Sequence, residues 1–429
     1  MSLTRTRDRM TKGTAVNVVD YRALTDTDSD WYPAFNAAVA SGATEVYVPP
    51  GLYPLSAPVW LRHNQTLRMA SGAILRATAV MDAVITSAEE NYHYAVRVIG
   101  GKIECNNLAG CGIWLRLFAY SHILDTEIWD STLYGIRLGS NTAIYSSYEA
   151  IIRNFRISRF GGTPAPEYST GIYFEKCGDS HLSDGVIMGQ KYGVSGSIND
   201  SKITRVHLWN TLEHGEITIG FGLGGVDNQL VQCQVDGPLL SSAYYLPGNR
   251  NHLIGCSLNY TGPSYGGVDL QAMGVFVEPN VIAVVEGCNF KSQSNLTRLA
   301  ADIAGGLYYA SLTNNTSLNT FSVIGSNGPA AIRAWVCFNG RSSAAIHDQY
   351  GIQSVSVLGV GHYRITLART MLTDDYSVQL TGQTDGLPTN GVIVIENGRS
   401  ANSIDVLAWD VVLDEAADLT YCSVLFVGR

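Results

Sequence analysis

Residues 171–190, GIYFEKCGDSHLSDGVIMGQ, and residues 192–210, YGVSGSINDSKITRVHLWN, decide the fold of this chain of 429 residues. Each stretch reads as an apolar strand led by a glycine, a short turn and a second apolar strand. The leading glycines, Gly171 and Gly193, are 22 residues apart. Solenoid proteins repeat at about 20–45 residues, so the spacing predicts a chain wound into stacked coils.

The same unit can be followed in both directions along the sequence. Gly112 and Gly135 begin two earlier units and are 23 residues apart. The step from Gly135 to Gly171 is 36 residues, and we interpret the segment GGTPAPEYS at 161–169 as an inserted loop. We expect the next unit to begin at Gly215, in HGEITI.

Aligned on these units, aliphatic residues form two columns that we expect to face the interior. The first column is Ile123, Ile152, Leu182, Ile203, Leu230 and Leu253. The second column, five positions later, is Ile128, Ile157, Ile187, Leu208, Val235 and Leu258. Alternate residues of a strand face opposite sides, so both columns point inward only if the chain bends between them. The positions outside or in this bend hold Asp125, Asn154, Asp184, Arg205 and Gln232.

Composition excludes several classes of protein. Charged residues make up 15% of the chain and hydrophobic residues 46%, which excludes a disordered protein. The formal net charge of −9 disfavours nucleic acid as a partner, because such binding depends on clustered Lys and Arg. No apolar run reaches the length of about 20 residues that spans a bilayer, so we expect no membrane insertion. No hydrophobic stretch follows the first basic residues, and we expect no secretion signal.

The cysteines favour a structural role. Eight are present without the CxxC pairing of metal sites, and without a secretion signal we expect free, buried thiols. Cys233 and Cys256 align with Phe155 and Val206, and Cys288 extends their stack, as small core side chains would. The sequence holds no phosphate loop, zinc-protease motif or nucleophile elbow, so we expect no cofactor and no metal.

The stretch GFGLGG matches the dinucleotide pattern GxGxxG at Gly220, Gly222 and Gly225. A dinucleotide site requires a helix to begin there, whereas the following VDNQLVQCQVDG reads as a strand. We interpret the stretch as a turn.

A short helix precedes the repeats. Residues 31–42, WYPAFNAAVASG, follow two possible capping residues, Asp28 and Asp30, and end at Gly42. One face of the helix holds Phe35, Ala38 and Val39. A helix followed only by short strands suits the open end of a solenoid, where it covers the exposed apolar cross-section.

The residues around this helix carry a family resemblance. VNVVDYRAL at 16–24, with FNAAVASGATEVYVPPGLYPLSAPVWLRHNQTLRMASGAILRA at 35–77, resembles the opening segment of pectate-lyase-like right-handed parallel β-helix proteins. The version in bacteriophage tailspikes is the most similar. The segment AWVCFNGRSSAAIHDQYGIQSVSVLGVGHYRITLARTMLTDDYSVQLTG at 334–382 resembles a small β-sandwich module at the ends of phage tail fibres and tailspikes.

These resemblances imply an all-β homotrimer: a right-handed parallel β-helix with an N-terminal helical cap, followed by a β-sandwich. We expect a short N-terminal adaptor at 1–15, the β-helix at 16–329 and the sandwich at 330–429. The resemblance implies that the sandwich serves trimerisation or receptor contact. Tailspikes often begin with a larger anchoring domain, so the short adaptor either attaches to another phage tail protein or indicates a fragment.

The function implied is that of a tailspike in the virion tail, acting at the bacterial cell surface on a surface polysaccharide. Outward positions combine aromatic, cationic and carboxylate side chains, which suits sugar rings with acidic groups. The candidate substrate-binding residues are Trp114, Arg137, Tyr173, Trp129, Arg156, Arg205 and Trp209.

The candidate catalytic residues are Asp184, Glu175, Asp179 and His207. A glycosidase needs two carboxyl groups, one of them protonated, and we favour hydrolysis. A lyase instead needs a base, such as His207, Arg205 or Tyr173, and a cation such as Arg156 or Arg205 that neutralises a uronate. The alternative is a tail protein that adheres to the host glycan without cleaving it.

Overall fold

The computed structural model describes residues 15–23, 28–87, 93–140, 147–159, 164–211, 213–260, 273–277, 281–292, 309–313, 316–318, 331–339, 345–350, 352–368, 376–384, 391–400, 403–410, 415–416 and 419–428. These residues fall into two compact units, which lie within Met1–Leu299 plus Ser311–Thr320 and within Ala300–Ala310 plus Phe321–Arg429. Each unit is described by itself. Among the described residues, no helix has the length and apolar character needed to cross a bilayer.

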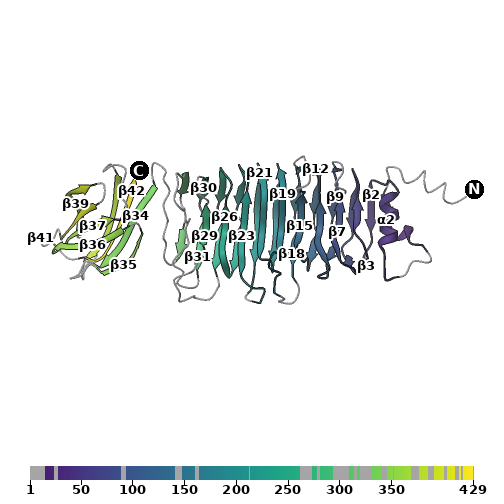
Figure 1. Cartoon of the computed structure of the whole chain (residues 1–429), viewed down its shortest axis with the longest axis horizontal. Coiled ribbons are helices and arrows are strands. Elements are labelled where there is room, and N and C mark those ends of the chain that lie inside the picture. Colours follow the sequence, from purple (N-terminus) through teal and green to yellow (C-terminus); the bar gives the residue numbers. More distant parts are fainter. Residues whose placement is uncertain are drawn as a thin grey trace, which may run out of the picture. The chain divides into compact units, whose positions relative to one another are not determined.

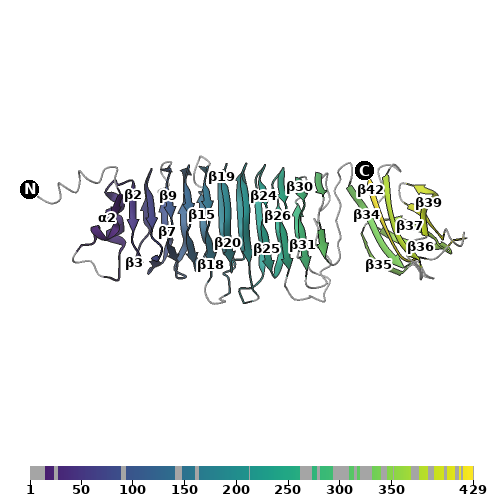
Figure 2. The ribbon, with the colours of Figure 1, turned by 180° about the vertical axis from the view of Figure 1, so that it is seen from behind.

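The first unit is a stack of parallel strands wound around a common core (Figures 1 and 2). Its described strands form two parallel sheets, which we call the long sheet and the short sheet. The long sheet contains β1 (Ala15–Asn17), β2 (Glu45–Val48), β3 (Gly51–Leu55), β5 (Thr66–Met69), β6 (Ala73–Ala77), β9 (Arg97–Ile99), β10 (Lys102–Glu104), β13 (His122–Leu124), β14 (Glu127–Trp129), β17 (Ile151–Arg153), β18 (Arg156–Ser158), β20 (His181–Met188), β22 (Lys202–Trp209), β24 (Gln229–Val231), β25 (Gln234–Gly237), β27 (Asn251–Ile254), β28 (Ser257–Tyr260), β30 (Ile282–Glu286), β31 (Asn289–Ser292), β32 (Tyr309–Thr313) and β33 (Thr316–Leu318). The short sheet contains β4 (Val59–Leu61), β7 (Met81–Ser87), β8 (His93–Tyr94), β11 (Ala109–Leu115), β12 (Phe118–Ala119), β15 (Tyr134–Gly139), β16 (Ser147–Tyr148), β19 (Thr170–Gly178), β21 (Tyr192–Asn199), β23 (Ile217–Gly224), β26 (Leu239–Leu246) and β29 (Met273–Val277).

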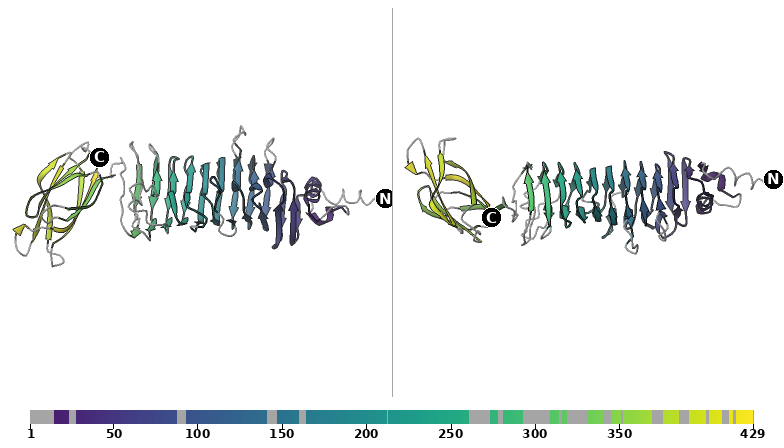
Figure 3. Two further views of the ribbon diagram at one scale, coloured as in Figure 1. Left: turned by 60° about the horizontal axis from the view of Figure 1, so that its bottom comes forward. Right: turned by 90° about the horizontal axis from the view of Figure 1, so that it is seen from above.

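One coil runs through a strand of the short sheet and then two strand positions of the long sheet. For example, β11 leads to β13 and β14, and the next coil begins with β15, which pairs with β11 in parallel. The views in Figure 3 show the same stacking from two further directions. The unit is therefore a parallel β-helix.

Both predicted aliphatic columns are confirmed. In the first column, Ile123 pairs with Ile152 and Ile152 with Leu182. In the second column, Ile128 pairs with Ile157 and Ile157 with Ile187. Every member of both columns is buried. A shift of one residue would turn each set outward, so burial of these aliphatic side chains fixes the register.

The predicted bend between the columns is also confirmed. Its residues have left-handed backbone conformations, which turn the chain between the two strand positions of a coil. We call this column the second bend: Asp125 (φ 57°), Asn154 (52°), Asp184 (57°), Arg205 (51°) and Gln232 (54°). Another left-handed column, the first bend, lies where the chain leaves the short sheet for the long sheet: Asn64, Ala95, Tyr120, Glu149, Asp179, Asp200, Asp227 and Arg250.

The repeated glycines face the second aliphatic column across the interior. A Cβ atom at Gly135 would lie 2.6 Å from Ile157 Cγ2, and one at Gly171 would lie 2.6 Å from Ile187 Cγ2. Carbon atoms in contact are about 3.5–4.0 Å apart. Only glycine fits opposite an isoleucine here, which explains the recurring Gly-Ile pattern.

The register of the following coil differs from the prediction. Gly220 of β23, rather than Gly215, lies beside Gly193 in the glycine column. Gly215 lies in a turn with φ 84°. The interpretation of GFGLGG as a turn is wrong for Gly220 and Gly222, which lie inside β23, and only Gly225 follows the strand. Glycine serves both close packing and turns, and the sequence pattern did not separate the two.

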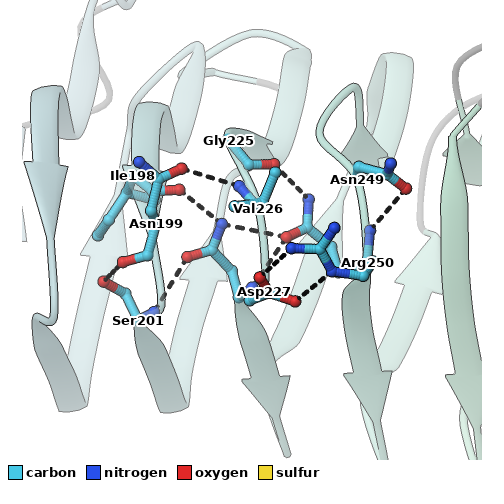
Figure 4. A network of polar contacts seen from close by, with 10 residues as sticks. Ile198, Asn199, Ser201, Gly225, Val226, Asp227, Asn249 and Arg250 are labelled. Atoms are coloured by element: carbon cyan, nitrogen blue, oxygen red, sulfur yellow. Dashed lines mark hydrogen bonds and ion pairs between the residues drawn. The ribbon is translucent and has the colours of Figure 1, made fainter.

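Polar side chains beside the first bend connect successive coils. Asn228 and Asn251 are fully buried. Asn228 Oδ1 accepts the backbone N–H of Ser201 at 3.2 Å, and Asn251 Oδ1 accepts that of Asn228 at 3.0 Å. Outside them, Arg250 pairs with Asp227 (Figure 4). These asparagines provide hydrogen-bond partners for backbone groups that have no partner in the sheets at the bend.

The cysteines of the β-helix are core residues. The six described in these coils are free and buried, as predicted. Cys233, Cys256 and Cys288 stack on successive coils, and the backbone N–H of Cys233 donates to Cys256 Sγ at 3.3 Å. The Cys256 thiol donates to the carbonyl of Leu230 at 3.4 Å. These contacts match the prediction of small core side chains.

The helical cap is present as well. A 3₁₀ turn, η1 (Val18–Tyr21), precedes helix α2 (Tyr32–Ala40). The N-cap position belongs to Trp31 rather than to Asp28 or Asp30 as predicted, but Asp30 Oδ1 accepts the backbone N–H of Tyr32 at 3.0 Å. The predicted helix face is buried: Phe35, Ala38 and Val39.

The second unit consists of two antiparallel sheets. One contains β35 (Ala345–Tyr350), β34 (Ala331–Asn339), β42 (Leu419–Gly428) and β38 (Tyr376–Thr384). The other contains β36 (Ile352–Gly359), β37 (His362–Leu367), β40 (Ser403–Asp410) and β39 (Gly391–Ser400), with β41 (Glu415–Ala416) paired to β40. Buried Phe338 and Tyr363 pack between the sheets, with ring centroids 5.2 Å apart. This is the expected β-sandwich.

Candidate functional site

Three predicted substrate-binding residues lie side by side on the outer face of the short sheet. Trp114 of β11 is opposite Arg137 of β15, and Arg137 is opposite Tyr173 of β19. The same row continues through Thr86 of β7 to Trp60 of β4. The register therefore confirms the alignment of these three residues.

Two arginines cover the central tryptophan. The guanidinium carbon of Arg116 lies 3.6 Å from the centroid of the Trp114 ring and 5.8 Å from that of Trp60. Arg137 lies 4.0 Å from the Trp114 centroid and 5.4 Å from that of Tyr134. Trp114 is consequently only 9% exposed, whereas Trp60 is 42% exposed. The prediction of an outward Trp114 needs correction: the ring points away from the core but lies beneath cations.

Glu175 belongs to the same surface. This candidate catalytic residue lies in β19 and forms an ion pair with Arg137, Nη2 to Oε2, at 2.5 Å. Tyr134 and Tyr173 stack beside this pair, with centroids 4.9 Å apart. Burial, and then the charge of Glu175, raises the pKa of Tyr173. We call these residues the aromatic–arginine surface: Trp60, Trp114, Arg116, Tyr134, Arg137, Tyr173 and Glu175.

Trp129 and Arg156 lie on another face, formed by the second strand position of the long sheet. Trp129 Nε1 donates to Glu127 Oε2 at 3.3 Å. Lys102 Nζ is 4.2 Å from the Trp129 centroid, and the Arg156 guanidinium carbon is 5.7 Å away. This tryptophan is therefore also held by cations.

His207 and Trp209 lie further along that face. His207 Nε2 is 3.0 Å from Asp236 Oδ2, a carboxylate that the sequence analysis did not select. Gln234 Nε2 donates to the same oxygen at 2.8 Å. Trp209 is 39% exposed. The register pairs Trp209 with Asp236, and this alignment was the signal that could have identified the histidine's partner.

The remaining predicted residues lie at the bends. Asp184 and Arg205 are neighbours in the second bend, with Oδ1 and Nε 2.7 Å apart. The hydrogen bond from Arg205 lowers the pKa of Asp184. Asp179 lies in the first bend, at φ 49°. The four candidate catalytic residues thus occupy the short sheet, two different bends and one face of the long sheet, and their roles stay predictions.

The charge state of the carboxyl groups constrains the chemistry. Every described carboxyl group whose pKa departs from its ordinary value has a lowered pKa: Glu104, Asp184, Asp227 and Asp405. For Glu104, burial opposes ionisation, but hydrogen bonds from Lys102 and Arg76 outweigh it. A general acid for glycoside hydrolysis needs a raised pKa instead. Over the same described residues, no three or more His, Cys, Asp or Glu side chains form a group suited to a metal ion.

Comparison with solved structures identifies proteins that have a similar fold. No protein-family model and no curated protein matches the chain. Among solved structures, the tailspike protein gp49 from Pseudomonas phage LKA1 is similar with a TM-score of 0.50 at 11% identity, over 96% of this chain and 100% of that one. This establishes the fold. The chain shares the parallel β-helix fold with a phage tailspike, as its opening segment predicted.

Two enzymes share the same fold over part of this chain. The endo-xylogalacturonan hydrolase from Aspergillus tubingensis has a TM-score of 0.50 at 10% identity, over 74% of this chain and 96% of that one. The lidless DFA-IIIase from Arthrobacter chlorophenolicus A6, in complex with GF2, has a TM-score of 0.50 at 11% identity, over 72% and 99%. Sequence identities this low establish a shared fold and do not establish a shared activity. The likeness of residues 334–382 to tail-fibre modules stays a prediction.

Proposed function

We propose that this chain is a phage tail protein whose β-helix binds and depolymerises a bacterial surface polysaccharide. The aromatic–arginine surface carries the proposal, because it combines aromatic rings, two arginines and a carboxylate within neighbouring coils. The shared fold with a tailspike and with an endo-xylogalacturonan hydrolase supports it. Aromatic faces stack on the C–H faces of sugars, and guanidinium groups hold carboxylate or phosphate substituents.

Glu175 is the proposed base of this surface. It forms the ion pair with Arg137, and a carboxylate acts as a base or nucleophile in reactions of this kind. The exposed ring of Trp60 supplies a stacking position two strands from Trp114, and Arg116 supplies a cation between them. We retain hydrolysis as the first proposed reaction, with elimination next to a uronate as its rival.

His207 offers a second proposed base. A hydrogen bond joins His207 Nε2 to Asp236 Oδ2. Such a bond to a carboxylate orients a histidine ring for proton transfer. The neighbouring Trp209 is exposed for sugar stacking. This surface suits elimination, because a histidine base can abstract a proton without a second carboxyl group.

Adhesion without cleavage is the second candidate function. The dispersion of the four candidate catalytic residues over two sheets and two bends favours it, since Glu175, Asp179, Asp184 and His207 do not converge on one site in a single chain. As further proposals, the protein forms a homotrimer, attaches to other phage tail proteins through residues 1–15 and acts from the virion tail at the cell surface. The sandwich at 330–429 is proposed to serve trimerisation or receptor contact.

The test uses the full chain and capsule or lipopolysaccharide purified from candidate hosts. Depolymerisation predicts shorter fragments, with new reducing ends after hydrolysis or new ultraviolet absorbance from an unsaturated uronate after elimination. Polymer that the protein binds but leaves at full length would support adhesion and refute cleavage.

Single variants then locate the base. We expect Glu175→Gln to lower the rate at least about a hundredfold, as loss of acid–base catalysis does, and Glu286→Gln, an exposed carboxyl of β30, to leave it unchanged. A large loss in His207→Asn with an active Glu175→Gln would assign the reaction to the second surface. Asp184→Asn and Asp179→Asn test the two bend residues in the same assay.

A further inference from the structure

Four ring side chains form a ladder across the first bend, outside both proposed catalytic surfaces. His63 and Tyr94 have ring centroids 5.4 Å apart, Tyr94 and Tyr120 are 6.4 Å apart, and Tyr120 and Tyr148 are 5.7 Å apart. Each ring lies two or three residues before β5, β9, β13 or β17, and these strands pair in that order. Tyr94 and Tyr148 are both in register with Ala119, so Tyr120 lies one position further along its coil. The ladder therefore climbs four consecutive coils, one ring per coil. We call these residues the aromatic ladder.

The ladder is open to solvent and limited in length. Tyr94 is 38% exposed and Tyr120 is 48% exposed. In the next coil the corresponding positions hold Gly178 and Asp179, so the aromatic run ends at Tyr148. Coils rise by about 4.8 Å each, and the four rings extend over about 14 Å along the axis.

Tyr120 occupies a backbone conformation that does not suit it. Its φ is 53°, in the left-handed region that the first bend requires of every coil. Asn64, Asp179 and Asp200 tolerate this conformation at the same position of other coils, whereas Ala95, Glu149 and Arg250 adopt it as Tyr120 does. A bulky side chain there is costly and uncommon.

Cationic and imidazole side chains follow the ladder on the next outward position. Arg97 and His122 are paired neighbours on β9 and β13, just after Tyr94 and Tyr120. Burial, and then the charge of Arg97, lowers the pKa of His122. Arg97 forms no ion pair within the described part of the chain, so its charge is available to an anionic ligand.

We propose that the aromatic ladder, with Arg97 beside it, binds a length of acidic polysaccharide along the coil axis, as a holding site separate from the site of cleavage. The rings follow one another at a coil's spacing, with one stacked pair, Tyr94 and Tyr120, between two edge-to-face contacts. A row of rings of this length suits a linear polymer better than a compact ligand. The Arg97 guanidinium group binds the acidic groups of this polymer. The inference rests on the proposed function, because it assigns a second contact to the same polymer.

The test measures binding of the full chain to immobilised capsular polysaccharide or lipopolysaccharide from a host to which the protein adheres. We expect Tyr94→Ala/Tyr120→Ala to weaken binding about tenfold. Tyr120→Phe keeps the ring and should bind as the wild type does. Tyr168→Ala, which removes a tyrosine that is 64% exposed outside the ladder, is the matched control and should change nothing.

A stability measurement separates function from structure. Asn suits the left-handed position, so Tyr120→Asn should keep or raise the unfolding midpoint while weakening binding. A lowered midpoint, or a change in oligomeric mass on gel filtration, would make the ladder a structural or subunit contact and overturn the inference.

The two proposals fail differently. Wild-type protein that binds no host polysaccharide would refute the proposed function. Wild-type protein that binds, with Tyr94→Ala/Tyr120→Ala binding equally well, would refute the ladder alone. If Arg97→Gln binds with the same salt dependence as the wild type, the acidic character of the ligand is refuted.

Discussion

Replacing Gly185 with alanine should destabilise the β-helix through a single neighbour. A Cβ atom on Gly185 would lie 2.0, 2.1 and 2.5 Å from three ring carbons of Phe155, in the adjacent coil. Carbon atoms pack at about 3.5–4.0 Å, so the ring would have to move by about 1.5 Å. Phe155 is buried. Overpacking of this kind costs about 1–3 kcal/mol of unfolding free energy.

A double-mutant cycle isolates this contact. Phe155→Leu alone should cost about 1–3 kcal/mol, because it leaves a cavity. In Gly185→Ala/Phe155→Leu the new methyl group partly fills that cavity. The combined cost should then fall short of the sum of the single costs by about 1 kcal/mol or more. Gly178→Ala is the control, since the nearest atom to its added Cβ is 3.8 Å away.

Guanidinium unfolding of the full chain, followed by tryptophan fluorescence, provides the measurement. We expect the midpoint of Gly185→Ala to fall, the midpoint of Gly178→Ala to stay, and the double variant to recover part of the loss. Equal midpoints for Gly185→Ala and Gly178→Ala, or strictly additive costs in the cycle, would show that Phe155 does not fill the space over Gly185.

Three further predictions concern the buried asparagines beside the first bend, the β-sandwich and the buried thiols. Asn251→Leu leaves the backbone N–H of the neighbouring coil without its acceptor, so it should cost about 1–3 kcal/mol in the same unfolding assay. Arg364 donates to both oxygens of Asp405 at 2.7 Å and so lowers the pKa of that carboxyl group in the folded state. The resulting stabilisation is complete above the unfolded pKa of about 3.9 and is lost as the pH falls through the lower folded value; Asp405→Asn should remove this acid-side slope in thermal melts. Burial raises the pKa of Cys111 and of Cys177 to about 12, so iodoacetamide should modify neither at pH 8 until denaturant is added, as mass spectrometry would show.

The architecture was predictable because its determinants are local and repeated. Each coil needs an aliphatic side chain at two inward positions. Columns such as Ile128, Ile157 and Ile187 therefore recur at a regular spacing that can be detected in the sequence. The odd step between columns required a bend, and Asp184 lies in it with a left-handed backbone. The coil at Gly215 was misplaced because a turn glycine and a core glycine look alike in sequence.

The site was less predictable because its chemistry depends on contacts between coils that periodicity does not encode. Alignment placed Trp114, Arg137 and Tyr173 in one row, yet it could not show that Arg116 and Arg137 would cover the Trp114 ring. The hydrogen bond between His207 and Asp236 likewise joins residues of two successive coils that are not directly opposite each other in the register. These details depend on how long side chains lean across the outer surface.

The separation of the candidate residues leads to a sharper mechanistic expectation. Glu175 on the short sheet and His207 on the long sheet face different directions of the coil, so one polymer segment cannot react at both. Within a single chain, therefore, only one of the two surfaces can be the cleavage site, and the other must bind, contact a neighbouring subunit or remain solvated. If Glu175→Gln and His207→Asn each abolished cleavage while leaving polymer binding and oligomeric mass unchanged, a site spanning two subunits would be required. Loss in one variant alone would place the reaction within a single chain.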